Sequence, residues 1–102
     1  AHAGKTTGHL TTRPIIFDGK NLELNLVTGE NGFIAAEIQD LDGNPIPGFS
    51  LNDCDPCQGD SISKKVSWKK NSSLRVLVGR AVRLQFAIRN SDLYSFQFID
   101  QE

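Results

Sequence analysis

Methionine is absent from the sequence, and the chain contains only two histidines, two cysteines, one tryptophan and one tyrosine. Both histidines, His2 and His9, lie at the start of the chain, so general bases and zinc ligands are scarce elsewhere. No serine or cysteine lies beside a recognisable base. No apolar run approaches the ~20 residues that a membrane helix requires. These absences argue against an enzyme and against a membrane-spanning protein.

An excess of charge is also lacking, because 11 basic residues nearly balance 12 acidic ones and the net charge is -1. This balance argues against general binding to nucleic acid or to anionic membranes, which favour basic surfaces. The length of 102 residues suits one domain. Residues 1–8 are small and polar, and we interpret them as a linker or a cloning remnant. Residues 9–102 are then the folded module.

Alternation of apolar and polar residues with period two dominates the chain, which is the signature of half-buried strands. It predicts six strands, at 10–17, 21–28, 33–40, 62–68, 81–90 and 93–100. Turn signals separate them, among them "GENG" at 29–32, "NSD" at 90–92 and the polar break "KKNSS" at 69–73. Short strands at regular spacing predict an all-β antiparallel sandwich or barrel.

The alternation also assigns an inward face to each strand. The residues expected in the core are Leu22, Leu24, Leu26, Ile34, Ala36, Ile38, Ile62, Val66, Trp68, Val82, Leu84, Phe86, Ile88, Tyr94, Phe96 and Phe98. For Trp68 this favours core packing over a sugar-stacking role, although exposed rings do stack on sugars. Phe33 and Phe49 lie beside turns and are the rings expected to be exposed.

Both cysteines lie in the turn-rich stretch "DCDPCQGD", at 53–60. Cys54 and Cys57 form a C-x-x-C pair, but a zinc ribbon needs a second such pair or two matching histidines. A thioredoxin-like dithiol opens a helix after a strand, whereas this pair lies in a loop rich in Asp, Pro and Gly. Two alternatives stay open for the pair: free thiols, or a local disulfide if the Cα atoms approach within ~7 Å.

Three aspartates of the same stretch, Asp53, Asp55 and Asp60, form a candidate calcium site. Alternating acids in a loop can bind Ca²⁺, which takes about six to eight oxygen ligands. The EF-hand pattern is not met, because no glutamate occupies its final loop position. The favoured interpretation is that these carboxylates cap turns through hydrogen bonds to the backbone, with calcium as the minor alternative and no other cofactor expected.

Polar residues alternate with the core residues along four of the predicted strands and would cluster on the outer surface of a shared sheet. Their amide, carboxylate and guanidinium groups form paired hydrogen bonds with vicinal hydroxyls, and arginine also binds carboxylates and sulfates. Any solvated sheet face has this composition, so the set is a candidate rather than a motif. The candidate ligand-binding residues are Asn25, Glu37, Gln39, Arg83, Gln85 and Arg89, flanked by Glu23 and Gln97.

The segments "TTRPIIF", "LELN", "AEIQDLDGNPIPGFSLNDCD", "SWK" and "VRLQFAIRNSDLYSFQF" carry a resemblance over residues 8–98. The chain resembles the C-terminal jelly-roll-like β-sandwich domain of secreted bacterial proteins related to glycoside hydrolases, which often follows a five-bladed propeller. Cys57 departs from that pattern, which usually has an apolar residue there. The resemblance implies an antiparallel β-sandwich of jelly-roll type and a secreted, periplasmic or extracellular location. It supplies no ligand-binding motif.

Together these observations predict a non-catalytic carbohydrate-binding module that targets an attached carbohydrate-active enzyme to polysaccharide. Its expected partners are a polysaccharide or oligosaccharide and the catalytic domain of the same parent chain, with neither nucleic acid nor membrane. The alternative is a structural β-sandwich that buttresses a neighbouring catalytic propeller and binds no sugar. That alternative predicts an exposed apolar surface where the neighbour would pack.

Overall fold

The computed structural model describes residues 2–3 and 7–99 of the chain. Its strands are β1 (His2–Ala3), β2 (Gly8–Thr11), β3 (Asn21–Gln39), β4 (Asp60–Lys65) and β5 (Arg83–Ile99). All of their pairings are antiparallel, which confirms the prediction of an all-β antiparallel fold. The described residues contain no α-helix, only the 3-10 turn η1 (Arg75–Leu77). No helix in this part of the chain is long and apolar enough to cross a membrane.

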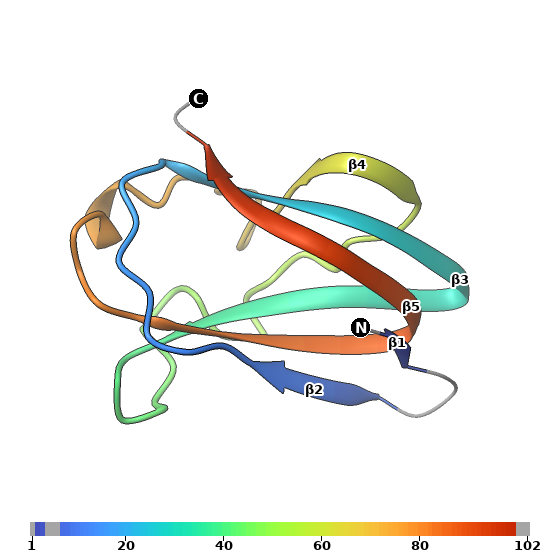
Figure 1. Cartoon of the computed structure of the whole chain (residues 1–102), viewed down its shortest axis with the longest axis horizontal. Coiled ribbons are helices and arrows are strands. Elements are labelled where there is room, and N and C mark those ends of the chain that lie inside the picture. The colour runs from blue at the N-terminus through green and yellow to red at the C-terminus, as the bar shows by residue number, and fades with distance from the viewer. Residues whose placement is uncertain (1, 4–6, 100–102) are drawn as a thin grey trace.

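The fold is organised around the two long strands β3 and β5, which pair along almost their whole length (Figure 1). Both strands bend together, at the right of Figure 1, so that their ladder has two limbs. We name these limbs by their β3 residues. The 21–28 limb pairs with 91–99 of β5 and is extended by β4, whereas the 33–39 limb pairs with 83–89 of β5 and is extended by β2.

The bend lies where the sequence predicts two turns, and that prediction is wrong. The register of β3 on β5 shifts between Thr28 and Phe33, so both turn signals form facing irregularities within one ladder. Asn31 and Asn90 have left-handed φ angles of 58° and 44°. A Cβ on Gly32 would lie 2.5 Å from the backbone oxygen of Asn90, so only glycine allows this close approach. Turn chemistry thus bends two continuous strands instead of ending four short ones.

One hydrophobic cluster joins the two limbs, and it confirms most of the predicted core. Leu22, Leu24 and Leu26 enter it from one limb, and Ile34, Ala36 and Ile38 from the other, all fully buried. From β5 and the residue before it come Val82, Leu84, Phe86 and Ile88. Val66 and Trp68 are also buried in it, after the end of β4. The period-two alternation therefore identified the inward faces of both long strands.

Tyr94 was expected in the core, but its side chain is 63% exposed. The register explains the error: Leu26 lies opposite Leu93 and Asn25 lies opposite Ser95, so Tyr94 has no residue opposite it. This extra residue reverses the alternation, which places Leu93 inward and Tyr94 outward.

Two other expectations about apolar side chains are also wrong. Ile62 is 82% exposed on β4, because β4 pairs with β3 through backbone hydrogen bonds while most β4 side chains point into solvent. Phe33 and Phe49 were expected to be exposed, but both are half-buried against the core cluster. The ring of Phe49 meets that of Trp68 edge-on at 5.4 Å between centroids.

The start of the chain contributes to the sheet. β1 pairs with Ser91 and Asp92 of β5, and β2 begins at Gly8 and pairs with Gln85 to Ile88. Part of the 1–8 segment, which the sequence suggests as a linker, therefore continues the β5 edge.

Candidate binding site

The "DCDPCQGD" stretch covers the edge of β3 that no regular strand pairs in the 33–39 limb. Ile34 and Cys57 exchange both backbone hydrogen bonds, at 3.0 and 2.8 Å. At Ala36, side chains supply the hydrogen-bond partners of the backbone. Its N–H donates to Cys54 Sγ at 3.3 Å, and its carbonyl accepts from Trp68 Nε1 at 2.9 Å. The stretch therefore substitutes for a missing strand, since buried backbone groups need partners.

The two cysteines are buried free thiols, so the disulfide left open by the sequence is not formed in the structure. Burial raises the pKa of Cys54 to about 11 and that of Cys57 to about 12. A protonated thiol is neither a nucleophile nor a good metal ligand. In this environment the pair is suited to packing and to accepting the Ala36 hydrogen bond.

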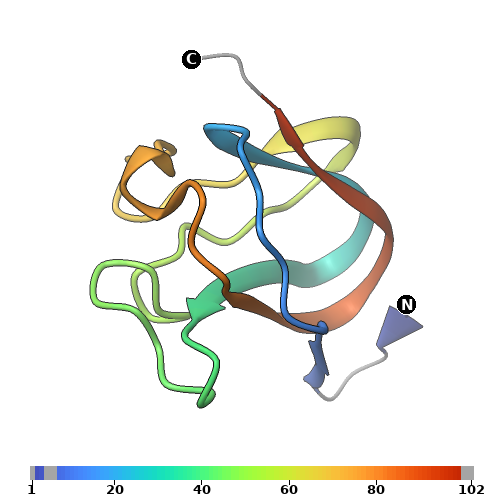
Figure 2. The same cartoon turned by 60° about the vertical axis from the view of Figure 1, so that its left-hand side comes forward.

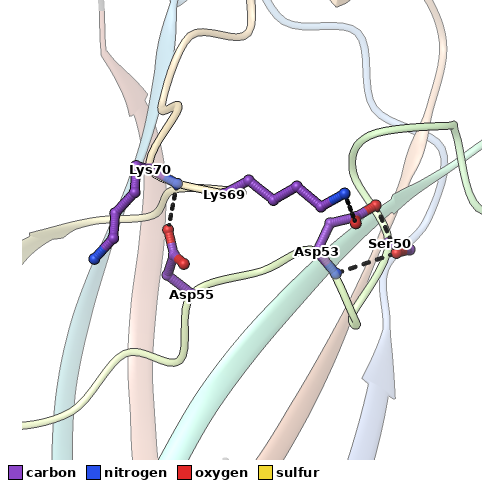
Figure 3. A network of polar contacts seen from close by, with 5 residues as sticks. All are labelled: Ser50, Asp53, Asp55, Lys69 and Lys70. Carbon is purple, nitrogen blue, oxygen red and sulfur yellow. Dashed lines mark hydrogen bonds and ion pairs between the residues drawn. The ribbon is translucent and has the colours of Figure 1, made fainter.

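Asp53 and Asp55 hold a tight turn at Lys69 and Lys70 (Figure 3). Asp53 Oδ1 lies 3.2 Å from Lys69 Nζ, and its backbone oxygen accepts from Lys69 N at 2.8 Å. Asp55 Oδ2 accepts from Lys70 N at 2.7 Å and from Ser67 Oγ at 2.6 Å. These carboxylates thus stabilise a backbone turn, as the favoured interpretation expected, but a turn distant in sequence.

Hydrogen bonds lower the pKa of both carboxyls below the ordinary value of 3.8. For Asp53 the largest cause is the side-chain hydrogen bond with Ser50, followed by that with Lys69. For Asp55 it is the hydrogen bond from Ser67, followed by the backbone N–H of Lys70. Both carboxyl groups therefore stay ionised at any pH above 3.8 and continue to accept the hydrogen bonds of the turn.

The turn itself has an unusual backbone. Trp68 and Asn71 exchange backbone hydrogen bonds of 2.8 and 3.0 Å, and the two residues between them have positive φ, 51° at Lys69 and 69° at Lys70. This is the pattern of a type I′ turn, in which Asn and Gly are the favoured residues. A left-handed conformation costs a non-glycine residue roughly 1–2 kcal/mol. Lysines here indicate that the surrounding contacts enforce the turn, and such strain is frequent at ligand-binding sites.

A hollow of about 440 Å³ lies beside this turn, and all of its lining residues are polar or charged. It is lined by residues 20, 21, 70–73 and 75, which come from the start of β3, the turn and the approach to η1. Lys20, Lys70 and Arg75 supply three cations, and no carboxylate belongs to this described lining. The start of β3 and the turn η1, which carry Asn21 and Arg75 of the lining, lie near each other in both views (Figure 1 and Figure 2), at the end opposite the bend in Figure 1.

Asn21, one wall of the hollow, is 2% exposed, and its amide Nδ2 has no hydrogen-bond partner among the described residues. A buried donor without a partner costs about 1–3 kcal/mol, so such groups are rare and call for a physical reason. Among the described residues Lys70 Nζ forms no ion pair, although its charge helps to lower the pKa of the neighbouring Asp55 carboxyl (Figure 3). The lining therefore includes a residue whose buried amide nitrogen has no partner, Asn21, and the ammonium group of Lys70.

The polar face predicted as the ligand site is organised differently from the expectation. Register places Glu37 opposite Gln85 and Gln39 opposite Arg83, so these four residues do lie together. However, Glu37 and Gln39 are each only 6% exposed. The error arises because alternation cannot reveal that the segment around Leu51 covers this face.

The hydrogen bonds of these four side chains are largely satisfied within the protein. Gln39 Nε2 donates to Glu37 Oε2 at 2.7 Å and to Gln85 Oε1 at 3.3 Å. Glu37 Oε1 also accepts from Leu51 N at 3.1 Å, and one guanidinium nitrogen of Arg83 donates to Thr12 O at 3.2 Å. The row therefore stabilises the packing of loops on the 33–39 limb and leaves few groups to a ligand.

The two remaining candidates of that face lie apart from this row. Asn25 is half-buried opposite Ser95 in the 21–28 limb. Arg89 is exposed and lines a second hollow, of about 320 Å³, with Glu30, Asn31 and Asn90 at the bend. The six predicted residues therefore do not form one binding surface.

The three aspartates of the candidate calcium site do not converge. Asp53 and Asp55 bind serine and lysine groups, and Asp60 is exposed at the start of β4. Within residues 2–3 and 7–99 no group of three or more His, Cys, Asp or Glu side chains is arranged to hold a metal ion. The arrangement assigns Asp53 and Asp55 to the turn rather than to calcium.

The residues of the hollow could not be found from the sequence. Lys20 ends the turn signal "DGK" at 18–20 and Asn21 follows it, whereas residues 70–73 belong to the polar break at 69–73, and both are ordinary features of loops. The hydrogen bond from Leu74 N to Lys20 O, at 2.8 Å, connects the two segments. Comparison with protein-family models, with curated proteins and with solved structures gave no match for this chain.

Proposed function

We propose that the chain is a non-catalytic carbohydrate-binding module, a β-sandwich of jelly-roll type, in a secreted carbohydrate-active protein. It would hold an attached catalytic domain near polysaccharide, because tethering raises the effective concentration of that domain at its substrate. The bent ladder of β3 and β5, with one core between its limbs, supports the sandwich part of this proposal.

The observation that carries the proposal is the polar hollow with the unpartnered Asn21 amide. Sugars are recognised by amide, hydroxyl and charged side chains that form hydrogen bonds with several oxygens at once. Asn71, Ser72 and Ser73 supply such groups next to Asn21 and Lys70. We therefore propose this hollow as the ligand site in place of the polar sheet face.

The lining argues for binding rather than catalysis. General acid–base chemistry on sugars generally uses a pair of carboxyl groups, and the described lining contains none. Its cations have no neighbouring nucleophile beyond ordinary serine hydroxyls, which need a base for activation. The proposal of a non-catalytic role follows from the composition of this site.

A structural domain that buttresses a neighbouring propeller is the second candidate. Exposed apolar side chains favour it: Ile16 is 69% exposed, Val76 80% and Val78 40%. The backbone of Gly79 donates to Phe17 O at 3.0 Å, so the segments that carry Ile16 and Val78 are neighbours. A packed partner domain would cover such a surface.

Affinity gel electrophoresis on a panel of neutral and anionic polysaccharides tests the proposal. We expect at least one polymer to retard the protein, and Asn21→Ser to reduce that retardation. Arg83→Ala tests the former candidate face and should leave the retardation unchanged. Failure of every polymer to retard a folded protein would contradict carbohydrate binding and favour the structural domain. Retardation that is lost in Arg83→Ala but not in Asn21→Ser would return the site to the sheet.

A further inference from the structure

The hydrogen-bonding groups of the hollow are mostly donors. Lysine and arginine have donors only, and the unpartnered atom of Asn21 is the donor Nδ2. The carbonyl oxygen of the Asn71 side chain already accepts from Ser73 N at 3.0 Å. A neutral sugar hydroxyl both donates and accepts, whereas an anionic oxygen only accepts. The hollow therefore matches an anionic group better than a neutral hydroxyl.

From this match we propose that the hollow binds a sugar through a carboxylate or sulfate group, which makes the chain a module for acidic polysaccharides. This inference rests on the proposed function, whose ligand class it narrows. The hydroxyls of Ser72 and Ser73 both donate and accept, so they suit the neutral hydroxyls of the same sugar.

The positive character of the hollow is local, because the whole chain has a net charge of -1. Three cations and no carboxylate line the hollow, and the nearest acids of the motif, Asp53 and Asp55, are held by Ser50, Ser67 and the turn. Lys20 and Arg75 have further contacts within the protein, so the inference is built on Lys70 and Asn21. Such a local patch attracts an anion without making the protein a general polyanion binder.

The turn geometry explains why Lys70 is available to a ligand. Lys69 directs its ammonium group to Asp53, and the Lys70 backbone is fixed by Asp55 (Figure 3). The side chain of Lys70 is thus attached to a restrained backbone, and its ammonium group has only the charge of Asp55 near it rather than a direct ion pair. Preorganisation of this kind lowers the cost of binding.

Pairs of acidic and neutral polymers with the same sugar distinguish binding through the charged group from binding through the sugar itself. The full chain is run on affinity gels with dextran sulfate and dextran, and with polygalacturonate and its methyl ester. We expect an acidic polymer to retard the protein, its neutral counterpart to fail, and the retardation to weaken as salt screens the charges. Lys70→Gln should weaken binding about tenfold, the loss expected for one charge-assisted hydrogen bond.

Lys64→Gln is the matched control, since Lys64 is an exposed lysine of β4 outside the hollow. Equal losses in both variants would indicate diffuse attraction and overturn the site. Lys70→Gly provides a second test, because glycine adopts the left-handed φ of 69° without strain. It should fold at least as well as the wild type and still lose the acidic polymer.

The remaining outcomes distinguish this inference from the proposed function. Equal binding of neutral and acidic polymers, unchanged by Lys70→Gln, would overturn the anion site and leave carbohydrate binding in place. Binding of no polymer would overturn both. Titration with inorganic sulfate, followed by the side-chain amide resonances of Asn21 and Asn71, identifies the source of the anion. A response to sulfate without binding to any polymer would indicate a small-anion site and overturn the acidic-sugar ligand.

Discussion

The edge of β3 that does not pair with β5 has different partners in the two limbs. In the 21–28 limb, the strand β4 pairs with β3 in an antiparallel ladder with one register shift between Leu24 and Leu26, and most of its side chains are exposed. In the 33–39 limb, irregular chain contacts β3, and it buries the side chains of Cys54, Cys57 and Trp68. There a thiol, an indole and a few backbone groups provide the hydrogen bonds that a strand would give.

This difference shows that an edge needs partners for its backbone groups, and that regular structure is only one source of them. The regular edge contributes backbone pairing with little burial. The irregular edge contributes burial as well, and it also positions the Lys69–Lys70 turn through Asp53 and Asp55. We therefore expect substitutions on the irregular edge to reduce stability far more than substitutions on β4.

Trp68→Ala should have the largest effect. It removes a side chain that is 3% exposed and leaves the Ala36 carbonyl without the indole donor. Loss of a buried Trp typically costs about 3–5 kcal/mol in the free energy of unfolding. Urea denaturation followed by circular dichroism measures it. Trp68→Phe keeps an aromatic ring and should lose about 1–3 kcal/mol for the missing donor. A loss below 1 kcal/mol in Trp68→Ala would contradict the importance assigned to this edge.

Cys54→Ala should have the next largest effect, because it leaves the buried Ala36 N–H without an acceptor. An unsatisfied buried donor costs about 1–3 kcal/mol. Cys57→Ala is the matched control: Cys57 is also buried, but it holds Ile34 through its backbone rather than its thiol. Urea unfolding followed by Trp68 fluorescence compares the two variants. Equal losses would show that the Cys54 thiol contributes packing alone.

Acid should weaken the irregular edge through Asp53 and Asp55. Because folding lowers their pKa below 3.8, their contribution is complete above that pH and is lost as pH falls through the lower folded values. Thermal unfolding between pH 6 and pH 2 should show a steeper loss of Tm below about pH 4 in the wild type than in Asp55→Asn. Asp60→Asn, on the exposed start of β4, should follow the wild type. An unchanged profile in Asp55→Asn would exclude this carboxylate as a determinant of stability.

The sequence was sufficient to predict the all-β class and most inward-facing residues, because both depend on local alternation. It was not sufficient for the bend, since the left-handed conformation that Asn31 and Asn90 adopt is compatible with a hairpin turn and with a bulge. Only pairing between distant segments decides which one forms. Glu37 was taken for a solvated residue because the segment that covers it is distant in sequence. The contact between Lys20 and Leu74 also joins distant segments, so no local pattern predicts it.

Ile62→Thr should have the smallest effect and tests the regular edge directly. Ile62 is 82% exposed and lies at the register shift of the β3–β4 ladder, between the paired residues Ser61 and Lys64, so its side chain gives little burial. Threonine keeps the β-branch that suits a strand. We expect a change within about 0.5 kcal/mol in urea denaturation. A loss comparable to that of Cys54→Ala would mean that β4 stabilises the 21–28 limb through its side chains, and the contrast between the two edges would then fail.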